Sequence, residues 1–390
     1  MGPFQRFDRR GILVLAFFWM LWFVSFTART LLSPIMPLIE DEFSVSHTKA
    51  GSLFALISFG NGLSLFVMGI FSGVIGYKRT FLISYALGGL LLLLMTFLRH
   101  FSLFYPLLFC IGFTTGAYLP CILPTLTRLY HERLWAKVLP IHDSAAPTSI
   151  LVAPFMALLL LRYLDWRNLF FLLGIFFLIL SLLFFLLMRE LAETRVRSGS
   201  VKIFRDLLKD RSLWLLNVVW VFAAGANMGL YYVLPLYLTK ELMLDLAFAN
   251  KAVGISRVGA LFFAVFVAFI LDLFETRRFL FSLLFCAGIL TFLVPSCPTG
   301  LLPLLLFFEA MIVTGFFPSS FVLASRLFAL EERSFATGFM VSLGSMLGIG
   351  GIPYVLGIFG DHLSFALGIR LLGLCLVGCS FLIFRIKTVE

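Results

Sequence analysis

The sequence is poor in charged residues. Asp, Glu, Lys and Arg make up only 13% of the 390 residues, whereas 61% are hydrophobic. A soluble domain carries about 25% charged and about 45–50% apolar residues, so this composition excludes a soluble globular protein. It predicts a protein whose surface faces lipid.

The sequence also lacks the patterns of a membrane enzyme or an ATP-driven pump. It contains 5 histidines and 6 cysteines, without an HExxH motif, a metal-ligand spacing or a glycine-rich phosphate loop. Cysteines inside apolar runs act as small apolar side chains. We therefore expect no catalysis, including reactions on lipids, no cofactor, no metal ion and no ATP-binding domain.

The main feature of the sequence is its long apolar segments. A bilayer-spanning helix needs about 20 predominantly apolar residues. The first run is too long for a signal peptide, and no small-residue cleavage site ends it. The sequence thus predicts an all-α integral membrane fold with 12 transmembrane helices, at residues 11–38, 50–72, 79–98, 102–127, 135–161, 168–188, 213–239, 247–272, 278–295, 301–325, 334–359 and 363–385.

The connection between the sixth and seventh helices is long and divides the helices into two sets of six. We expect an N-terminal six-helix bundle over residues 1–188, a cytoplasmic linker over 189–212 and a C-terminal six-helix bundle over 213–390.

The basic residues indicate how the chain is oriented. With both termini in the cytoplasm, 21 of the 30 Lys and Arg residues lie on the cytoplasmic side, 6 lie outside, and Arg29, Arg257 and Arg370 lie inside spans. Cytoplasmic loops carry the Lys/Arg excess. We therefore expect a multi-pass protein of the cell membrane (inner or plasma membrane) with both termini cytoplasmic. The net charge of +10 follows from this topology, and we expect no nucleic-acid partner.

The two halves repeat. The segment FSGVIGYKRT at residues 71–80 aligns with ILDLFETRRF at 270–279 at an offset of 199 residues, and the same offset places Pro154 on Pro353. Parallel six-helix repeats are typical of transporters whose substrate site lies near the membrane midplane.

At these loops the chain resembles the major facilitator superfamily of transporters, and the likeness extends over nearly all of its length. In that family the loop after helix 2 usually reads G-x-x-x-D-R-x-G-R-R. The first copy has Gly73 where the acid is usual, whereas the second copy keeps an acid, Asp272. The first copy also has Gly69, Gly76, Lys78 and Arg79, whereas the second copy has Ala268, Arg277 and Arg278 and lacks both glycines of the motif.

The resemblance implies two six-helix halves that work by alternating access. Helices 1, 4, 7 and 10 would line a central cavity, and helices 2, 5, 8 and 11 would flank it. The repeated loops would form a cytoplasmic gate, and we expect a monomer embedded in the bilayer. Ala153-Pro154 stands where the family's antiporters have Gly-Pro, which disfavours drug antiport. The predicted gate residues are Gly73, Lys78, Arg79, Asp272, Arg277 and Arg278.

Five further residues are unexpected inside spans: Arg29, His142, Asp143, Arg257 and Glu309. A charged residue at a helix centre costs about 2.5–3.5 kcal/mol and usually faces the protein interior. By the resemblance we expect all five to face one aqueous chamber. Arg370 belongs to helix 12, an outer helix in the family, and we interpret it as structural.

The balance of these charges favours an anionic substrate. Arg29 and Arg257 balance Asp143 and Glu309 only while both acids are ionised, so protonation of either acid leaves a positive site. A guanidinium binds carboxylate or phosphate oxygens through two parallel hydrogen bonds. The hypothesis is a proton-coupled symporter of a small mono- or dicarboxylate, similar to family members that carry organic anions. Arg29 and Arg257 would bind the anion, and Asp143, Glu309 or His142 would carry the proton.

Three uncharged side chains are further candidates for substrate binding. Asn227 and Tyr231 are four residues apart on helix 7 and therefore share a face. Tyr118 occupies a similar position on helix 4. Aromatic residues in helices more often serve packing.

Several alternatives stay open at this point. Arg29 or Arg257 could be paired permanently with an acid, and His142 could be structural. The cargo could instead be amphipathic drugs exported against protons, or an inorganic anion such as nitrate or cyanate. The sequence decides neither the substrate nor the direction of transport.

Overall fold

The computed structural model describes residues 4–188 and 205–386, so residues 189–204 of the predicted linker lie outside the described part. Within it, all twelve predicted spans are helical. The prediction of an all-α, multi-pass membrane fold is confirmed. The observed spans are Arg9–Phe43, His47–Met68, Tyr77–Met95, Phe101–Leu129, Glu132–Leu160, Trp166–Leu187, Arg211–Glu241, Leu246–Phe263, Thr276–Ser296, Leu302–Leu327, Phe335–His362 and Phe365–Arg385.

The first six spans contain nine α-helices. Their bounds are α1 Arg9–Thr30, α2 Leu32–Phe43, α3 His47–Ile75, α4 Tyr77–Met95, α5 Phe104–Gly116, α6 Tyr118–Leu129, α7 Glu132–Asp143, α8 Ala145–Leu160 and α9 Trp166–Leu187. The later spans contain α11 Arg211–Ala224, α12 Leu230–Leu236, α13 Leu246–Ile270, α14 Thr276–Leu293, α15 Leu302–Leu327, α16 Leu330–Leu343, α17 Ile352–His362 and α18 Phe365–Leu382.

Spans 7 and 11 contain glycine-rich interruptions. The turns Gly225–Gly229 (η2) and Gly344–Gly351 (η6) are π-helical, and a third π-helical turn, Tyr237–Glu241 (η3), ends span 7. Such wide turns are rare and frequently lie at functional sites. The candidate residue Asn227 lies in one of them.

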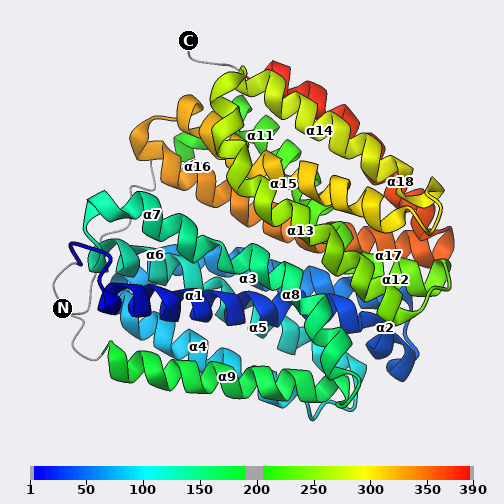
Figure 1. Ribbon diagram of the computed structural model, residues 1–390, viewed down its shortest axis with the longest axis horizontal. Helices are drawn as coiled ribbons and strands as arrows, with labels where there is room; N and C mark the ends of the chain where they lie inside the picture. Colours follow the sequence, from blue (N-terminus) through cyan, green and yellow to red (C-terminus); the bar gives the residue numbers. More distant parts are fainter. Residues whose placement is uncertain (1–3, 189–204, 387–390) are drawn as a thin grey trace. The chain divides into compact units, whose positions relative to one another are not determined.

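The described residues form two compact units. The first unit comprises residues 1–32 and 60–198. In it α1 packs against α8, and α4 packs against α9, as Figure 1 shows. Buried aromatic rings fill the space between these helices: Tyr85 of α4 stacks on Phe177 of α9 with ring centroids 4.3 Å apart.

The second unit comprises residues 33–59 and 199–390. In it α13 packs against α15, and α14 packs against α18 (Figure 1). The second unit therefore includes α2 and the first part of α3, although both lie within residues 1–188, the range predicted for the N-terminal bundle.

Residues 33–59 are held in the second unit by a hydrogen bond, by ring stacking and by a close approach of two backbones. The Ser33 hydroxyl donates a hydrogen bond to the Tyr231 carbonyl at 2.8 Å. The rings of Phe54 and Tyr232 stack with centroids 4.5 Å apart. A Cβ atom added to Gly51 would lie 2.6 Å from the Pro353 carbonyl oxygen, so glycine is required for this approach.

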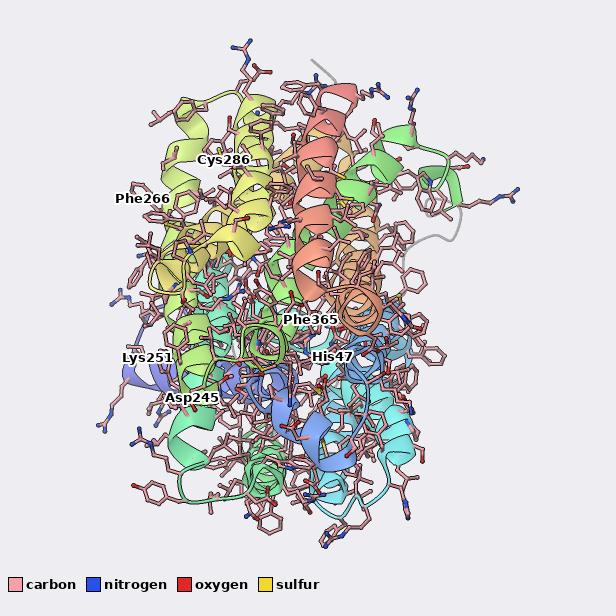
Figure 2. The ribbon with its side chains drawn as sticks, turned by 90° about the vertical axis from the view of Figure 1, so that its right-hand side faces the viewer. His47, Asp245, Lys251, Phe266, Cys286 and Phe365 are labelled. Atoms are coloured by element: carbon pink, nitrogen blue, oxygen red, sulfur yellow. The ribbon has the colours of Figure 1, made fainter. Side chains whose placement is uncertain are left out.

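Polar contacts complete this packing at the start of α3. The Asp361 carboxylate of α17 accepts the backbone N–H groups of His47 and Thr48, each at 2.8 Å. The His47 ring lies 4.8 Å from the Phe365 ring, and Figure 2 shows these two side chains near each other. Lys240 forms an ion pair with Asp41.

Candidate functional site

The second unit contains a buried guanidinium. Arg257 of α13 is only 3% exposed. Its Nη1 donates to the Asn227 side-chain oxygen and its Nη2 donates to the Asn227 backbone carbonyl, both at 3.1 Å. The same Asn227 carbonyl also accepts the Leu230 backbone N–H at the end of the π-helical turn Gly225–Gly229.

Two further side chains hold this pair in place. The Asn227 amide donates to the Thr314 hydroxyl of α15 at 2.8 Å, which fixes the orientation of the amide. The Arg257 guanidinium lies 5.0 Å from the centre of the Tyr231 ring, a cation–π distance. Asn227 and Tyr231 therefore present one face of span 7 to Arg257, in agreement with their spacing.

Glu309 of α15 is a separate buried group in the same unit. It is 1% exposed and accepts a hydrogen bond from the Thr291 hydroxyl of α14 at 3.1 Å. Arg257 and Glu309 interact electrostatically. Among the described residues they form no direct ion pair, so Arg257 is not neutralised by a carboxylate in contact with it.

In the first unit Arg29 lies on the buried side of α1. Its guanidinium is 4.3 Å from the centre of the Phe26 ring, and the residue is 7% exposed. Nearby on α1, the hydroxyls of Thr27 and Thr30 each lie 3.0 Å from the Ser149 hydroxyl of α8. Hydroxyl bridges of this kind join transmembrane helices.

Tyr118 and His142 are joined in the first unit. The Tyr118 hydroxyl of α6 lies 3.0 Å from His142 Nε2 of α7. Trp22 of α1 stacks on Tyr118 with ring centroids 4.6 Å apart, and its plane lies within 8° of the His142 plane. Tyr118 is fully buried. Its hydroxyl is therefore engaged by the protein.

Asp143 differs from its neighbour His142. It is exposed, whereas His142 is fully buried. An acid that the protein leaves uncovered thus follows a buried histidine in the sequence.

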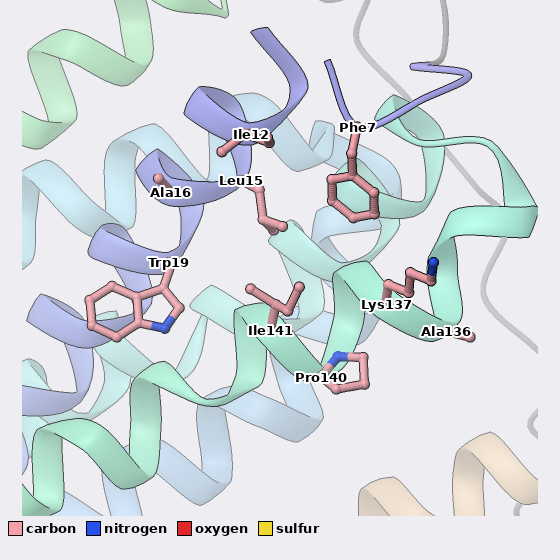
Figure 3. A pocket seen from close by; sticks show the side chains of 9 residues that line it. All are labelled: Phe7, Ile12, Leu15, Ala16, Trp19, Ala136, Lys137, Pro140 and Ile141. Atoms are coloured by element: carbon pink, nitrogen blue, oxygen red, sulfur yellow. The ribbon is translucent and has the colours of Figure 1, made fainter. Parts of the chain in front are cut away.

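A groove of about 730 Å³ lies elsewhere in the first unit, between the start of α1 and α7 (Figure 3). Its walls are apolar, apart from Lys137 on α7. Such walls provide few hydrogen bonds to an anion, so the groove is not the site formed by the buried charges. The lining residues are Phe7, Ile12, Leu15, Ala16, Trp19, Ala136, Lys137, Pro140 and Ile141.

Comparison with known proteins identifies the family. The family model described as Major Facilitator Superfamily matches residues 18–353. The chain belongs to the major facilitator superfamily. It is a secondary transporter with the fold of that family, and not an enzyme.

Individual relatives are distant. The Protein TsgA homolog of Buchnera aphidicola subsp. Baizongia pistaciae (strain Bp) is 21% identical over 262 residues, covering 66% of this chain and 64% of that protein. The match thus spans less than two thirds of that relative.

Solved structures of superfamily transporters share the fold. A mutant of the nucleoside transporter NupG has a TM-score of 0.79 at 13% identity and covers 96% of this chain and 100% of its own. A D-xylose-proton symporter has a TM-score of 0.78 at 16% identity, covering 97% and 99%. A bacterial homolog of the human lysosomal transporter Spinster, inward-facing and occupied, has a TM-score of 0.78 at 13% identity, covering 97% of each chain.

The superfamily's repeated loops are only partly described. Gly76 has φ of 110°, a conformation that favours glycine, just before Lys78 and Arg79 at the start of α4. In the second copy Arg277 donates to the Ile386 carbonyl, and Arg278 pairs with Glu275 at 2.8 Å. The surroundings of Gly73 and Asp272 lie outside the described residues, so the predicted gate stays a prediction.

Several side chains that contact the buried polar groups of this transporter were not predicted from the sequence. Thr314, Thr291 and Trp22 are ordinary residues of apolar helices, and nothing in their local sequence distinguishes them. One signal was available: Trp22 precedes Arg29 by seven residues, two helical turns, so both lie on one face of α1. Arg370, interpreted as structural, donates to Ser296 at 3.2 Å.

Proposed function

We propose that this transporter moves a small organic anion of the mono- or dicarboxylate type across the cell membrane together with protons, by alternating access, with both termini in the cytoplasm. The observation that carries the proposal is the state of Arg257. It is a permanent charge, buried deep in a membrane protein, that is bound by a neutral amide residue and not by a carboxylate in contact with it.

The hydrogen bonds of Arg257 leave room for a ligand. A guanidinium has five N–H groups. Within the described part of the chain two of them are used, both on Asn227, and Nε has no partner. Burying a charge in this way costs several kcal/mol unless it is compensated. An anionic substrate would supply the missing charge and accept the remaining hydrogen bonds.

The neighbouring residues favour a small, planar anion over a bulky cation. Tyr231 covers one side of the guanidinium, and Asn227 fixes its plane. A carboxylate matches such a fork through two parallel bonds. Cationic drugs would be repelled by Arg257, so drug efflux is less well supported. In the first unit Arg29 is the second candidate for an anion ligand.

Glu309 would couple the anion to protons. While it is ionised, its negative charge partly offsets Arg257; once protonated, it leaves the guanidinium charge uncompensated. Proton uptake would then strengthen anion binding. Asp143 and His142 would contribute in the first unit.

Purified protein in proteoliposomes would test the proposal. Uptake of radiolabelled lactate and succinate is measured with the lumen alkaline relative to the outside. Arg257→Gln should reduce uptake roughly 10- to 150-fold, because hydrogen bonds to charged groups contribute about 1.5–3 kcal/mol. Arg29→Gln should also reduce it.

Arg370→Gln is the matched control, since the Arg370 side chain of α18 hydrogen-bonds, among the described residues, to Ser296, which follows α14. It should transport like the unmodified protein. Unchanged uptake in both Arg29→Gln and Arg257→Gln, or equal loss in all three variants, would refute the assignment. Export of amphipathic dyes insensitive to both carboxylates would support the drug-efflux alternative instead.

A further inference from the structure

The two ring nitrogens of His142 have unequal surroundings. Nε2 lies 3.0 Å from the Tyr118 hydroxyl. Nδ1 is buried and forms no hydrogen bond within the described part of the chain. Leaving a buried polar atom without a partner costs about 1–3 kcal/mol. The fold therefore keeps Nδ1 unsatisfied at a cost.

The Tyr118 hydroxyl determines which nitrogen carries the proton. It lies 2.8 Å from the Phe18 carbonyl oxygen as well as 3.0 Å from His142 Nε2. A phenol has one hydrogen, and a carbonyl oxygen only accepts. The Tyr118 hydrogen is thus directed to Phe18, and Nε2–H must donate to the Tyr118 oxygen. Neutral His142 then has a bare lone pair at Nδ1.

Packing keeps the ring in this orientation. The His142 ring is parallel to the Tyr118 and Trp22 rings within 8°. Turning the ring over would replace the Nε2 contact by a carbon atom and lose the hydrogen bond. The titratable groups around it are Tyr118 of α6, Tyr85 of α4 next to Tyr118, and Asp143 of α7, while α1 contributes the uncharged Trp22.

We propose that His142 is the proton-binding residue of the first unit, with Nδ1 as the acceptor and Tyr118 as the positioning residue. The step is a simple protonation: a hydronium ion gives up a proton and becomes water, an N–H bond forms at Nδ1, and the neutral ring becomes an imidazolium.

This inference rests on the proposed function, because the charge gained at His142 has a use only if an anion compensates for it. Each proton adds one positive charge to the first unit, the same sign as Arg29. The inference also changes the role of Tyr118, which the sequence predicted as a candidate for substrate binding: Tyr118 orients His142 and does not bind substrate.

The tautomer is testable without any substrate. Nitrogen NMR spectra of isotope-labelled histidines are recorded in lipid nanodiscs, and the His142→Gln variant identifies the signals of His142 among those of the 5 histidines. We expect a protonated Nε2 and an unprotonated Nδ1 that becomes protonated on acidification. Tyr118→Phe should mix the two tautomers. A proton on Nδ1 in the neutral ring would overturn the proposal.

Transport tests the role. His142→Gln keeps an N–H donor for Tyr118 but removes the titratable nitrogen. We expect it to retain lactate exchange at equal pH to within roughly 13-fold, since one neutral hydrogen bond contributes about 0.5–1.5 kcal/mol. It should lose lactate-driven proton movement, read with a dye in the lumen. His100→Gln, outside the helices, is the control.

The outcomes separate the two proposals. If unmodified protein moves neither lactate nor succinate, the proposed function fails, while the NMR experiment still decides the tautomer. If His142→Gln moves protons with lactate as well as the unmodified protein does, the role of His142 is refuted and the carrier assignment stands. If His142→Gln loses both lactate exchange and proton movement, the role of His142 is structural and the inference is also overturned.

Discussion

Asp361 and His47 are 314 residues apart in the sequence, yet the Asp361 carboxylate accepts the His47 backbone N–H at 2.8 Å. The second carboxylate oxygen accepts the N–H of Thr48 at the same distance. The first N–H groups of a helix have no partner within it. Asp361 of α17 therefore caps α3 from a distant part of the chain and holds residues 33–59 in the second unit.

Asp361→Asn should loosen the start of α3. An amide keeps one oxygen and loses the charge, and loss of a helix cap costs about 0.5–2 kcal/mol. We expect faster hydrogen exchange in the amides of residues 47–59, with exchange in α9 unchanged. Asp165→Asn is the control, because Asp165 precedes α9 without capping it through its side chain. Equal exchange in both variants would contradict the capping role.

Gly51→Ala should disturb the same packing by a different route. The added methyl group would lie 2.6 Å from the Pro353 carbonyl oxygen, so the backbones of α3 and span 11 must separate. Overpacking of this kind costs about 1–3 kcal/mol. We expect a lower melting temperature in detergent. A Cβ atom at Gly378 meets nothing within 4 Å, so Gly378→Ala should melt like the unmodified protein.

Thr314→Val should weaken substrate binding without abolishing transport. Valine has nearly the shape of threonine but cannot accept the Asn227 amide hydrogen, so the amide would no longer orient Arg257. Loss of a neutral hydrogen bond of about 0.5–1.5 kcal/mol corresponds to a roughly 2- to 13-fold higher KM for the transported carboxylate. Thr127→Val removes a hydroxyl bound only to its own helix and should leave KM unchanged.

Glu309→Gln should make anion binding independent of pH. In the unmodified protein, protonation of Glu309 on acidification removes a negative charge near Arg257, so affinity for lactate should rise as the pH falls. Glutamine resembles the protonated acid and still accepts the Thr291 hydrogen bond. Thermal shift titrations with lactate at acidic and neutral pH give the affinities.

We expect the variant to bind equally at both pH values, near the acidic affinity of the unmodified protein. Glu275→Gln, which alters an exposed ion pair with Arg278, should keep the normal pH dependence. A variant that binds only weakly at both pH values would show that ionised Glu309 is needed for the site, the opposite of the coupling proposed.

Much of this transporter could be predicted because its determinants are local in the chain. Twelve apolar runs of sufficient length specify twelve membrane spans, and the cost of a charge in lipid indicates that Arg257, Glu309 and His142 have a function. Asn227 and Tyr231 were found together because their spacing alone places them on one face. The repeated loops identified the family.

The partners of the buried groups could not be predicted. Glu309 hydrogen-bonds to Thr291, not to an arginine, and Tyr118 is bound to His142. In a helix that is apolar on every side, the sequence pattern does not show which face meets which neighbour. Rotation and contact of helices therefore remain undetermined until the bundle is assembled.

The sequence by itself determined that this protein lies in a lipid bilayer, how many times it spans the bilayer, and which few ionisable residues lie among apolar ones, because each depends on hydrophobicity along a single segment. Only the tertiary structure decided that Asn227 binds Arg257, that the Nδ1 atom of His142 is left without a partner, and that residues 33–59 join the second unit. These depend on directional hydrogen bonds and close packing between segments distant in the chain, and such contacts exist only once the helices have packed together.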